Sequence, residues 1–368
     1  MSSLQTPDLP TQDHELLPHL WTVILAGGVG SRFWPASTPS QPKQLLRLAS
    51  DEPLIRDTVD RITPLVPADR LRILTGGRLA DPILAALPEL GPGNLLLEPR
   101  AAGTAPALAW AAVEIERRDP EAVMISLHAD HAIEPAERFR ARVAWAARCA
   151  VEHRRLFTIG AVPDRPETGF GYVRLGEPLA STDGPMDEAF AVARFVEKPD
   201  LATARRYLTE GGYLWNTGIF VWRVADLLDE LERHTPELAE LIGVAREGGT
   251  EEFFRRAPNL SIDEGLLERS DRVGVVPADF RWDDIGAWDA LFRTHAVDEA
   301  GNVHAGQAYA VDSSGCALYA QDGPIVAFGV EDLIVVRTAG VTFVTNRDRA
   351  PELKSLLARL PERLRTLD

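Results

Sequence analysis

The most constraining feature of this chain is an apolar strand that runs directly into a glycine turn, in the segment 23–46, VILAGGVGSRFWPASTPSQPKQLL. The turn holds Gly27, Gly28 and Gly30. Glycine adopts positive φ angles at little steric cost, and successive N–H groups in such a turn form a concave site for anions. Arg32 and Lys43 follow and add positive charge. The segment predicts a phosphate-binding turn at the end of a buried strand.

Two better-known glycine loops do not fit this segment. A P-loop needs a Gly-Lys pair, and the chain contains none. A dinucleotide-binding turn needs a third glycine where this chain has Phe33. A glycine-rich turn without a ligand stays open as the alternative.

Length and charge limit the class of protein. The 368 residues, 45% of them hydrophobic, favour two domains or one large domain with an appendage. A net charge of -16 argues against a nucleic-acid-binding surface. No segment has the roughly 20 apolar residues of a membrane span, and the polar start lacks the features of a signal peptide. We therefore expect a cytoplasmic protein that binds neither nucleic acid nor membrane, with Cys149 and Cys316 as buried free thiols.

Lysine is rare in this chain. Of 39 basic residues only three are lysine, so a retained lysine hints that a compact ammonium is required. Lys354 lies on an amphipathic surface pattern and is ordinary. Lys43 and Lys198 stand in the short Pro-bounded motifs QPKQ and EKPD, where a functional role is favoured.

The alternation of apolar runs and helical patterns predicts an α/β fold, a mainly parallel mixed sheet flanked by helices. The expected strands of the first half are 22–26, 71–75, 94–97, 123–127 and 156–159. The expected helices are 54–62, 79–87, 106–118 and 135–153. Strands 194–196, 219–222 and 273–276, a helix over 201–210 and a helical stretch over 225–269 extend this domain.

The character of the chain changes near residue 298. Short β runs at 308–311, 317–320, 325–328, 333–336 and 341–345 precede a helix over 351–364. We expect a tail over 1–20, a large domain over 21–297 and a β-rich C-terminal domain with a terminal helix over 298–368. No strict repeat supports a solenoid.

Two carboxylates are candidate metal ligands. Asp130 follows the strand 123–127 at its carboxyl end, where open α/β sheets place their ligands, and beside a phosphate loop its expected task is to hold Mg²⁺. A helix N-cap is the alternative. Asp284 is preferred over Asp283 as the second ligand. The alternative for this pair is a solvated turn or a helix cap. His128 and His131 lack a third ligand at zinc spacing and are interpreted as satisfied polar neighbours.

Three weaker motifs predict a sugar pocket. They are ETGFGYV, FVEKP and WNTGIF, which contain Gly171, Glu197, Lys198 and Asn216. Carboxylate and amide groups suit sugar hydroxyls, and a lysine suits a phosphate.

Taken in order, these segments, together with EPRAAGTAPA, HADH, SIDEGLLERS and RWDDIGAW, resemble the bacterial mannose-1-phosphate guanylyltransferases of the sugar nucleotidyltransferase superfamily. The resemblance implies a Rossmann-like, GT-A-like domain and the transfer of GMP from GTP to mannose 1-phosphate with Mg²⁺. It implies these nucleotide-site residues: Ala26, Gly27, Gly28, Gly30, Gly103 and Thr104. It implies that Arg32 and Lys43 are catalytic, that Asp130 and Asp284 hold the metal, and that Gly171, Glu197, Lys198 and Asn216 contact the sugar phosphate.

Some implications stay open. The chain lacks the extra isomerase domain of longer relatives, which implies a single activity, and a homodimer is the candidate assembly. Ala102 and Thr38 depart from the family pattern and put nucleotide contacts in doubt. We hypothesise that Glu98 accepts the N1–H and N2–H₂ donors of guanine, with backbone carbonyls as the alternative. The other functions are a nucleotidyltransferase for another nucleotide and hexose phosphate, a non-catalytic regulatory subunit and an NAD-linked dehydrogenase.

Overall fold

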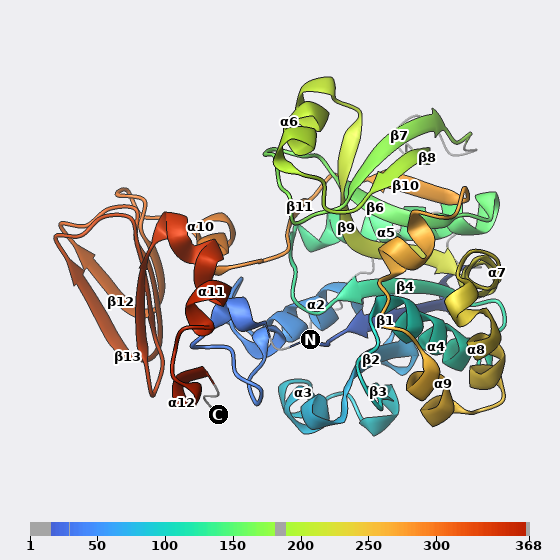
Figure 1. Cartoon of the computed structure of the whole chain (residues 1–368), viewed down its shortest axis with the longest axis horizontal. Helices are drawn as coiled ribbons and strands as arrows, with labels where there is room; N and C mark the ends of the chain where they lie inside the picture. The colour runs from blue at the N-terminus through green and yellow to red at the C-terminus, as the bar shows by residue number, and fades with distance from the viewer. Residues whose placement is uncertain (1–15, 29, 181–188, 366–368) are drawn as a thin grey trace, which may run out of the picture.

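The fold is built on a nine-stranded mixed sheet (Figure 1) in the order β3-β2-β1-β4-β9-β6-β10-β8-β7. The computed structural model describes residues 16–28, 30–180 and 189–365, so most of the expected tail lies outside the described residues. The strands are β1 (Leu20–Leu25), β2 (Leu71–Gly76), β3 (Leu95–Glu98), β4 (Val123–His128), β6 (Leu156–Ala161), β7 (Tyr172–Pro178), β8 (Phe190–Val196), β9 (Tyr213–Arg223) and β10 (Val273–Pro277). The α/β class and the mixed sheet are confirmed.

The sheet has two halves of different pairing. β3, β2, β1 and β4 run parallel. Beyond β4 most pairings are antiparallel, with β9 between β4 and β6, and only β6 and β10 are parallel. The chain moves outward from β1 to β3 and then returns to β4 on the other side of β1. The carboxyl ends of β1 and β4 therefore flank the point where the strand order reverses, which is where open α/β sheets bind ligands.

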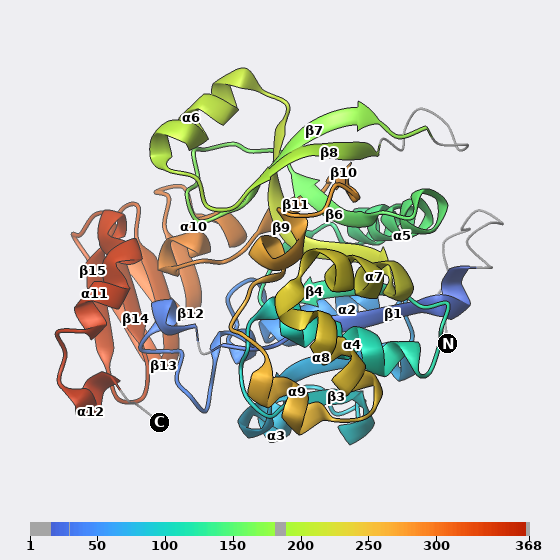
Figure 2. The same cartoon turned by 45° about the vertical axis from the view of Figure 1, so that its right-hand side comes forward.

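Helices cover both faces of the sheet (Figures 1 and 2) because alternate residues of each buried strand point to opposite sides. In β1, Trp21 and Val23 face one core and Leu20 and Ile24 face the other. The first core is covered by α4 (Thr104–Glu116), α7 (Val224–His234), α8 (Pro236–Arg246) and α9 (Thr250–Arg256). The second is covered by α2 (Leu54–Ile62), α3 (Ala80–Ala86) and α5 (Ala136–His153), while α6 (Leu201–Glu210) packs in a separate aromatic cluster. Among the described residues, no helix is long and apolar enough to cross a membrane.

The sequence did not predict a small sheet that matters for the site. It consists of β5 (Ala132–Glu134) and β11 (Arg281–Asp283), paired antiparallel with Asp283 opposite Ala132. β5 begins two residues after Asp130, and β11 ends one residue before Asp284. This sheet therefore brings together two candidate metal ligands that lie far apart in the sequence.

The C-terminal part forms a separate sheet of β12 (Val303–Val311), β13 (Ala317–Phe328), β14 (Leu333–Arg337) and β15 (Thr342–Asn346). Two sequence expectations need correction here. The runs 317–320 and 325–328 are one strand, because the stretch through Gly323 continues β13 instead of turning. The expected helix over 351–364 is a 3-10 helix (Arg347–Glu352) followed by α11 (Leu353–Leu357) and α12 (Glu362–Arg365), because Pro361 cannot continue a helix.

The C-terminal sheet pairs its successive strands in parallel from β12 to β14. Successive parallel strands are the arrangement of a solenoid, for which the sequence showed no strict repeat. The sheet packs on the segment after β1 in a shared hydrophobic cluster that includes Phe33 and Trp34 (Figure 2). Trp288, which lies just before α10 (Leu291–Thr294), joins this cluster with its ring centroid 5.0 Å from that of Tyr319.

Candidate functional site

The glycine turn begins at the carboxyl end of β1, and its first residue is held on three sides. Ala26 donates its N–H to the Leu74 carbonyl at 2.9 Å. The Ala26 carbonyl accepts from Gln44 Nε2 at 3.0 Å and from Thr75 Oγ1 at 2.9 Å. Gly27 and Gly28 then lie exposed, with nothing close to where a side chain would stand. The backbone of the turn is thus open to a ligand from a fixed starting point.

Gly30 brings Lys43 beneath this turn. Its φ is 71°, and a Cβ at this position would lie 2.4 Å from the Lys43 Cβ, so only glycine allows this packing. The buried Lys43 Nζ donates to Asp130 Oδ2 at 2.8 Å and to the Asp284 carbonyl at 2.7 Å. The structure therefore brings together Lys43, Asp130 and Asp284, three residues singled out from separate motifs.

Asp284 and its neighbour Asp283 have different surroundings. Asp283 forms an ion pair with Arg293, and its Oδ1 accepts the Ile285 N–H at 2.8 Å. Asp284 has no side-chain partner of this kind among the described residues, and burial raises the pKa of its carboxyl to about 6. A Cβ on Gly286 would lie 3.0 Å from Asp284 Oδ2 and 3.5 Å from an Arg32 guanidinium nitrogen, which places Arg32 at the same turn. We call Arg32, Lys43, Asp130 and Asp284 the loop side of the site.

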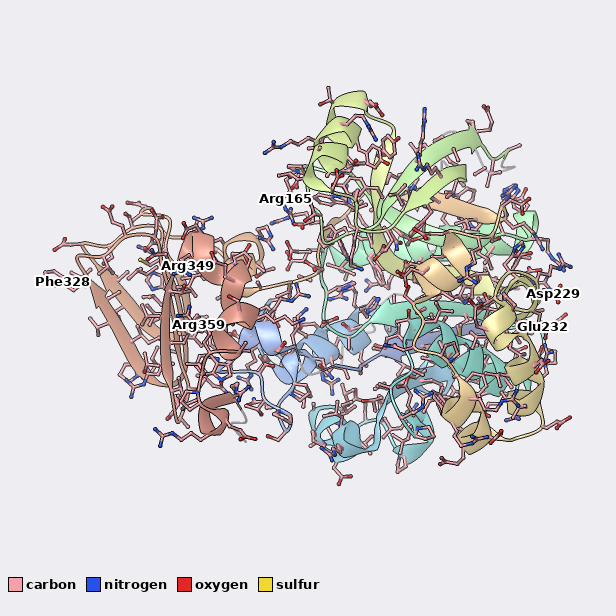
Figure 3. All side chains as sticks on the ribbon, viewed as in Figure 1. Arg165, Asp229, Glu232, Phe328, Arg349 and Arg359 are labelled. Carbon is pink, nitrogen blue, oxygen red and sulfur yellow. The ribbon has the colours of Figure 1, made fainter. Side chains whose placement is uncertain are left out.

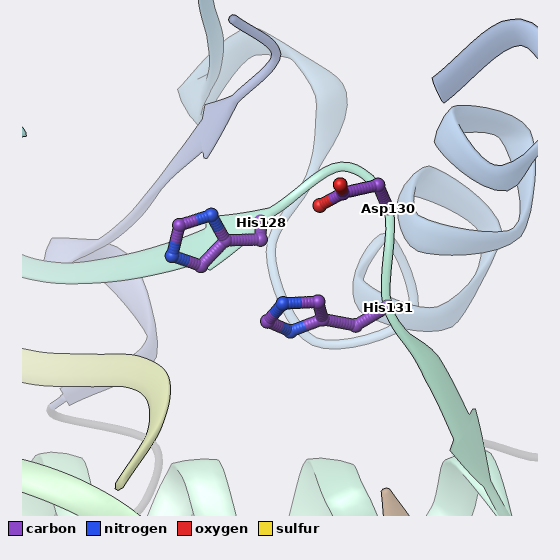
Figure 4. Close-up of side chains that lie close together, drawn as sticks. All are labelled: His128, Asp130 and His131. Atoms are coloured by element: carbon purple, nitrogen blue, oxygen red, sulfur yellow. The ribbon is translucent and has the colours of Figure 1, made fainter. Parts of the chain in front are cut away.

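Two histidines flank Asp130 (Figure 4), and ligand atoms of His128, Asp130 and His131 lie within 4.8 Å of one another. From the sequence, these histidines were interpreted as polar neighbours and not as metal ligands. Trp282 Nε1 donates to His131 Nδ1 at 3.2 Å. Burial lowers the pKa of both imidazoles, so they are neutral and the His131 proton is on Nε2. His131 is therefore a hydrogen-bond donor toward the site.

The charge of Asp130 is stabilised despite its surroundings. Burial opposes ionisation, but the Lys43 ammonium, through its charge and its hydrogen bond, outweighs it and holds the pKa of Asp130 below its usual range. Asp130 and Asp284 thus offer oxygen atoms, and oxygen is the ligand type that Mg²⁺ prefers.

On the other side, Gly171, Glu197 and Asn216 gather as expected, and Asp263 joins them. We call these four residues the amide side. Asn216 Nδ2 donates to Asp263 Oδ1 at 2.8 Å, and Asn216 Oδ1 accepts from Thr158 Oγ1 at 2.8 Å. A Cβ on Gly171 would lie 2.6 Å from Glu197 Oε2, so the chain passes directly against this carboxylate. The exposed Lys198 forms an ion pair with Glu197. The backbone φ angle of Lys198 is 44°.

Asp263 is the residue that sequence reasoning missed. It lies in a π-helix over Asp263–Leu267, and π-helical turns are frequent at functional sites. Burial, then the charge of Glu197, raises the pKa of Asp263 to about 7. The only sequence signal was the motif SIDEGLLERS, in which Asp263 and Glu268 are both acidic and Glu268 accepts the Glu197 N–H at 3.0 Å.

A cavity of about 230 Å³ lies on the amide side and reaches Asp284 of the loop side. Its lining includes His128, Asp284, Thr104, Glu197, Lys198 and Asn216. A ligand in this cavity can therefore contact Asp284 and the amide side together.

The remaining nucleotide-site candidates lie around the carboxyl end of the sheet. Glu98 ends β3, and burial raises the pKa of its carboxyl to about 7. Gly103 precedes α4, and Thr104 Oγ1 accepts the Ile262 N–H at 2.8 Å. Of the two departures, Ala102 is buried, and Thr38 Oγ1 accepts the Gln41 N–H at 3.0 Å.

Comparisons with known proteins cover both parts of the chain. The nucleotidyl transferase family model matches residues 21–301, and a model described as a MannoseP isomerase/GMP-like beta-helix domain matches residues 306–360. A mannose-1-phosphate guanylyltransferase of Escherichia coli K12 is 36% identical over 93% of this chain and 73% of its own length. The xanthan biosynthesis protein XanB of Xanthomonas campestris is 36% identical over 92% of this chain and 72% of its own.

A solved structure from Thermus thermophilus, described as a mannose-1-phosphate geranyltransferase, has a TM-score of 0.84 at 32% identity. It covers 93% of this chain and 99% of its own. The similarity extends through both the large sheet and the C-terminal sheet.

Proposed function

The chain belongs to the mannose-1-phosphate guanylyltransferase family of nucleotidyl transferases, and we propose that it forms GDP-mannose and pyrophosphate from GTP and α-D-mannose 1-phosphate. The observation that carries this proposal is that Asp284, whose backbone carbonyl accepts from Lys43, lines the same cavity as the four residues of the amide side. A reaction between two phosphorylated substrates needs both in one site, with the attacking oxygen aligned to the phosphorus.

The loop side takes the triphosphate. The open backbone of Gly27 and Gly28, with Gly30, cradles phosphate oxygens, and Arg32 and Lys43 neutralise them. The Lys43 ammonium donates to Asp130 and to the Asp284 carbonyl, and its third N–H remains for a phosphate oxygen. Ala26, Gly103 and Thr104 complete the nucleotide site beside the carboxyl ends of β1 and β3.

Asp130 and Asp284 hold the divalent metal, and we propose Mg²⁺. Both donors are carboxylates, and His131 already accepts a hydrogen bond at one nitrogen and carries a proton on the other, so the donor set fits an oxygen-seeking cation. Bound there, Mg²⁺ would neutralise charge on the α-phosphate and the leaving pyrophosphate.

The amide side takes mannose 1-phosphate. The Glu197 carboxylate accepts hydrogen bonds from sugar hydroxyls, and the Asn216 amide donates to them or accepts from them. The Gly171 backbone lies close to Glu197 and to the sugar, and the Lys198 ammonium pairs with the phosphate. The phosphate oxygen attacks the α-phosphorus of GTP directly, and pyrophosphate leaves, so no residue forms a covalent intermediate.

A pyrophosphate-release assay over a matrix of nucleoside triphosphates and hexose 1-phosphates tests the proposal. GTP with mannose 1-phosphate should give the highest kcat/KM. A higher value for another pair would reassign the substrates. Binding of GDP-mannose without turnover of any pair would favour a regulatory subunit, and nicotinamide binding would favour a dehydrogenase.

Glu98 is our candidate for guanine recognition. A carboxylate can accept both N1–H and N2–H₂ of guanine, whereas ITP lacks the N2 amine. Glu98→Gln should reduce the preference for GTP over ITP. An unchanged preference would assign the contact to backbone carbonyls.

We propose a homodimer in the cytoplasm. Tyr309 pairs with Val326 and Val311 with Phe328 across β12 and β13. Phe328 is 69% exposed at the end of β13, on the side of the C-terminal sheet away from the large domain (Figure 3). A second copy would cover these apolar residues. Light scattering should give twice the chain mass, and Phe328→Lys should halve it; a monomeric wild type would contradict the assembly.

A further inference from the structure

The amide side contains a carboxyl group that the proposed reaction does not use. Asp263 lines the cavity together with Glu197 and Asn216. Its Oδ1 accepts from Asn216 Nδ2 at 2.8 Å, which is its one hydrogen bond from another side chain within the described chain. The two oxygens of a carboxylate offer about four acceptor positions, so most of the hydrogen-bonding capacity of Asp263 is open to a ligand.

The Asn216 amide fixes how this carboxyl group is presented. Asn216 Oδ1 accepts from Thr158 Oγ1 at 2.8 Å and from the Gly218 N–H at 3.3 Å. Thr158 lies on β6 and Gly218 on β9, so the amide oxygen is held by two strands of the large sheet. Because its oxygen is held there, the amide directs its nitrogen toward Asp263. The Asp263 oxygen that accepts from it therefore has a defined place in the cavity.

The backbone that leads to Asp263 is docked on the N-terminal end of α4. Leu260 forms two backbone hydrogen bonds with this end of the helix, of 3.1 and 3.0 Å. Gly103 makes the approach possible, because its φ is 83° and a Cβ at this position would clash with the Leu260 carbonyl. Thr104 Oγ1 then accepts the Ile262 N–H at 2.8 Å. Asp263 thus follows directly from a fixed stretch of backbone.

A second carboxylate lies on the same wall of the cavity. Burial, and then the charge of Glu197, raise the pKa of Asp263, and both groups line one space. The Glu197 N–H donates to Glu268 Oε1 at 3.0 Å, so the segment 260–268 also holds the backbone of Glu197. The neighbouring cation, Lys198, is exposed and pairs with Glu197. Among the described residues no cation pairs with Asp263, and the hydroxyl groups of a sugar are donors that would fill its open acceptor positions without bringing a charge.

We propose that Asp263 is a specificity-determining residue, which binds one hydroxyl of the sugar beside the hydroxyls bound by Glu197. This inference rests on the proposed function, which puts the sugar phosphate on the amide side. A site built to hydrogen-bond a hydroxyl discriminates strongly against a substrate that lacks it, because polar groups of the site then lose their partner. Two carboxyl groups held at fixed places on one wall can therefore distinguish hexose 1-phosphates that differ in a single hydroxyl.

The test uses the full chain and the hexose 1-phosphate that the pyrophosphate-release assay selects, together with its monodeoxy analogues, each of which lacks one hydroxyl. Asp263→Ala should remove the discrimination against one analogue, whose kcat/KM relative to the parent sugar should rise about tenfold, because the group that required this hydroxyl is gone. The discrimination against the other analogues should be kept. The KM for GTP should stay within about twofold of wild type, which shows that the variant is folded. Asp263→Ser, whose side chain is too short to replace the carboxylate, should give the same pattern.

Glu264→Gln is the matched control. Glu264 is the next residue of the same π-helix, is exposed, accepts from Ser261 Oγ at 3.2 Å and is not part of the cavity lining. This variant should keep the wild-type pattern for every analogue. An equal loss for the parent sugar and all analogues would mean that Asp263 only supports the fold of the site, and a wild-type pattern in both Asp263 variants would mean that it does not contact the sugar. Either result would overturn the proposal. Failure of the proposed function would be visible separately, since the wild type itself would then release no pyrophosphate with any hexose 1-phosphate, and this inference would fall with it.

Discussion

The loop side and the amide side of the site are built by different means. The loop side combines the exposed backbone of its glycines with two cationic side chains. One is a buried lysine between two aspartates, and the other is an exposed arginine. The amide side depends on a hydrogen-bond network in which Asn216 bonds to both Asp263 and Thr158. The first side therefore offers charged groups and open backbone to a ligand, whereas the second offers side chains that hold one another in place. Charge should dominate mutational effects on one side, and geometry on the other.

The largest effect should come from the two carboxylates of the loop side. Asp130→Ala or Asp284→Ala removes one of the two carboxylates that we propose as metal ligands, and turnover should fall by roughly 10³-fold or more. Pyrophosphate release at saturating Mg²⁺ measures this. Asp289→Asn is the control, because among the described residues Asp289 pairs with Arg293 alone. Full activity of the double variant, with both Asp130→Ala and Asp284→Ala, would contradict the metal assignment.

Lys43 should follow closely. Lys43→Ala should lower kcat by about 10²-fold, because a buried ammonium aimed at the reacting phosphate is lost. Lys43→Arg should not restore it, since the space between the Asp130 carboxylate and the Asp284 carbonyl fits a compact ammonium. Lys354→Ala, on an exposed face of α11, should have wild-type kinetics. Activity in Lys43→Arg equal to wild type would show that only charge matters there.

The amide side should respond more in KM than in kcat. Asn216→Ala breaks the bonds to Asp263 and Thr158 and should raise the KM for mannose 1-phosphate about tenfold. Thr158→Val removes only one of these bonds and should have a smaller effect. If instead kcat falls and KM is unchanged, the network acts on the transition state, and the contrast between the two sides is wrong.

The smallest effect concerns stability and pH. The pKa of Asp263 is about 7 in the folded protein and near 4 in the unfolded chain, so the folded state binds the extra proton between these values. The free energy of unfolding should therefore fall as pH rises from about 4 to 7. Asp263→Asn should reduce this dependence when urea unfolding at pH 5 is compared with pH 8. An identical change in both proteins would mean that Asp263 titrates normally.

Local patterns predicted most of the large domain. The helices over 54–62 and 201–210 have the expected bounds, since their apolar spacing and flanking prolines or glycines are sequence signals. The three-residue strands β5 and β11 were missed because each exists only through pairing with a segment almost 150 residues away. The continuous β13 was divided in two because Gly323 and Pro324 favour a turn in the absence of neighbouring strands.

The same limit applied to the site. Residues in distinctive motifs, such as Lys43 and Asn216, could be named in advance, and in the structure Lys43 donates to Asp284, which lines the same cavity as Asn216. Asp263 lies in a stretch that the sequence predicts as helical, and nothing in that pattern distinguishes it from a surface residue. Its place in the site depends on its contact with Asn216. The hydrogen bond from Trp282 to His131 joins two separate motifs. Neither motif, taken by itself, indicates this contact.

The C-terminal sheet has a consequence for protein engineering. Trp34, two residues beyond Arg32, donates its indole N–H to the Leu364 carbonyl at 2.8 Å, and Trp288 donates to the Trp34 carbonyl at 3.0 Å. The segments that carry Arg32 and Asp284 thus share one hydrophobic cluster with the C-terminal sheet. The two sheets are not interchangeable modules: a chimera that exchanges the C-terminal part between relatives must carry over the matching loop segments, or lose the shape of its catalytic turn.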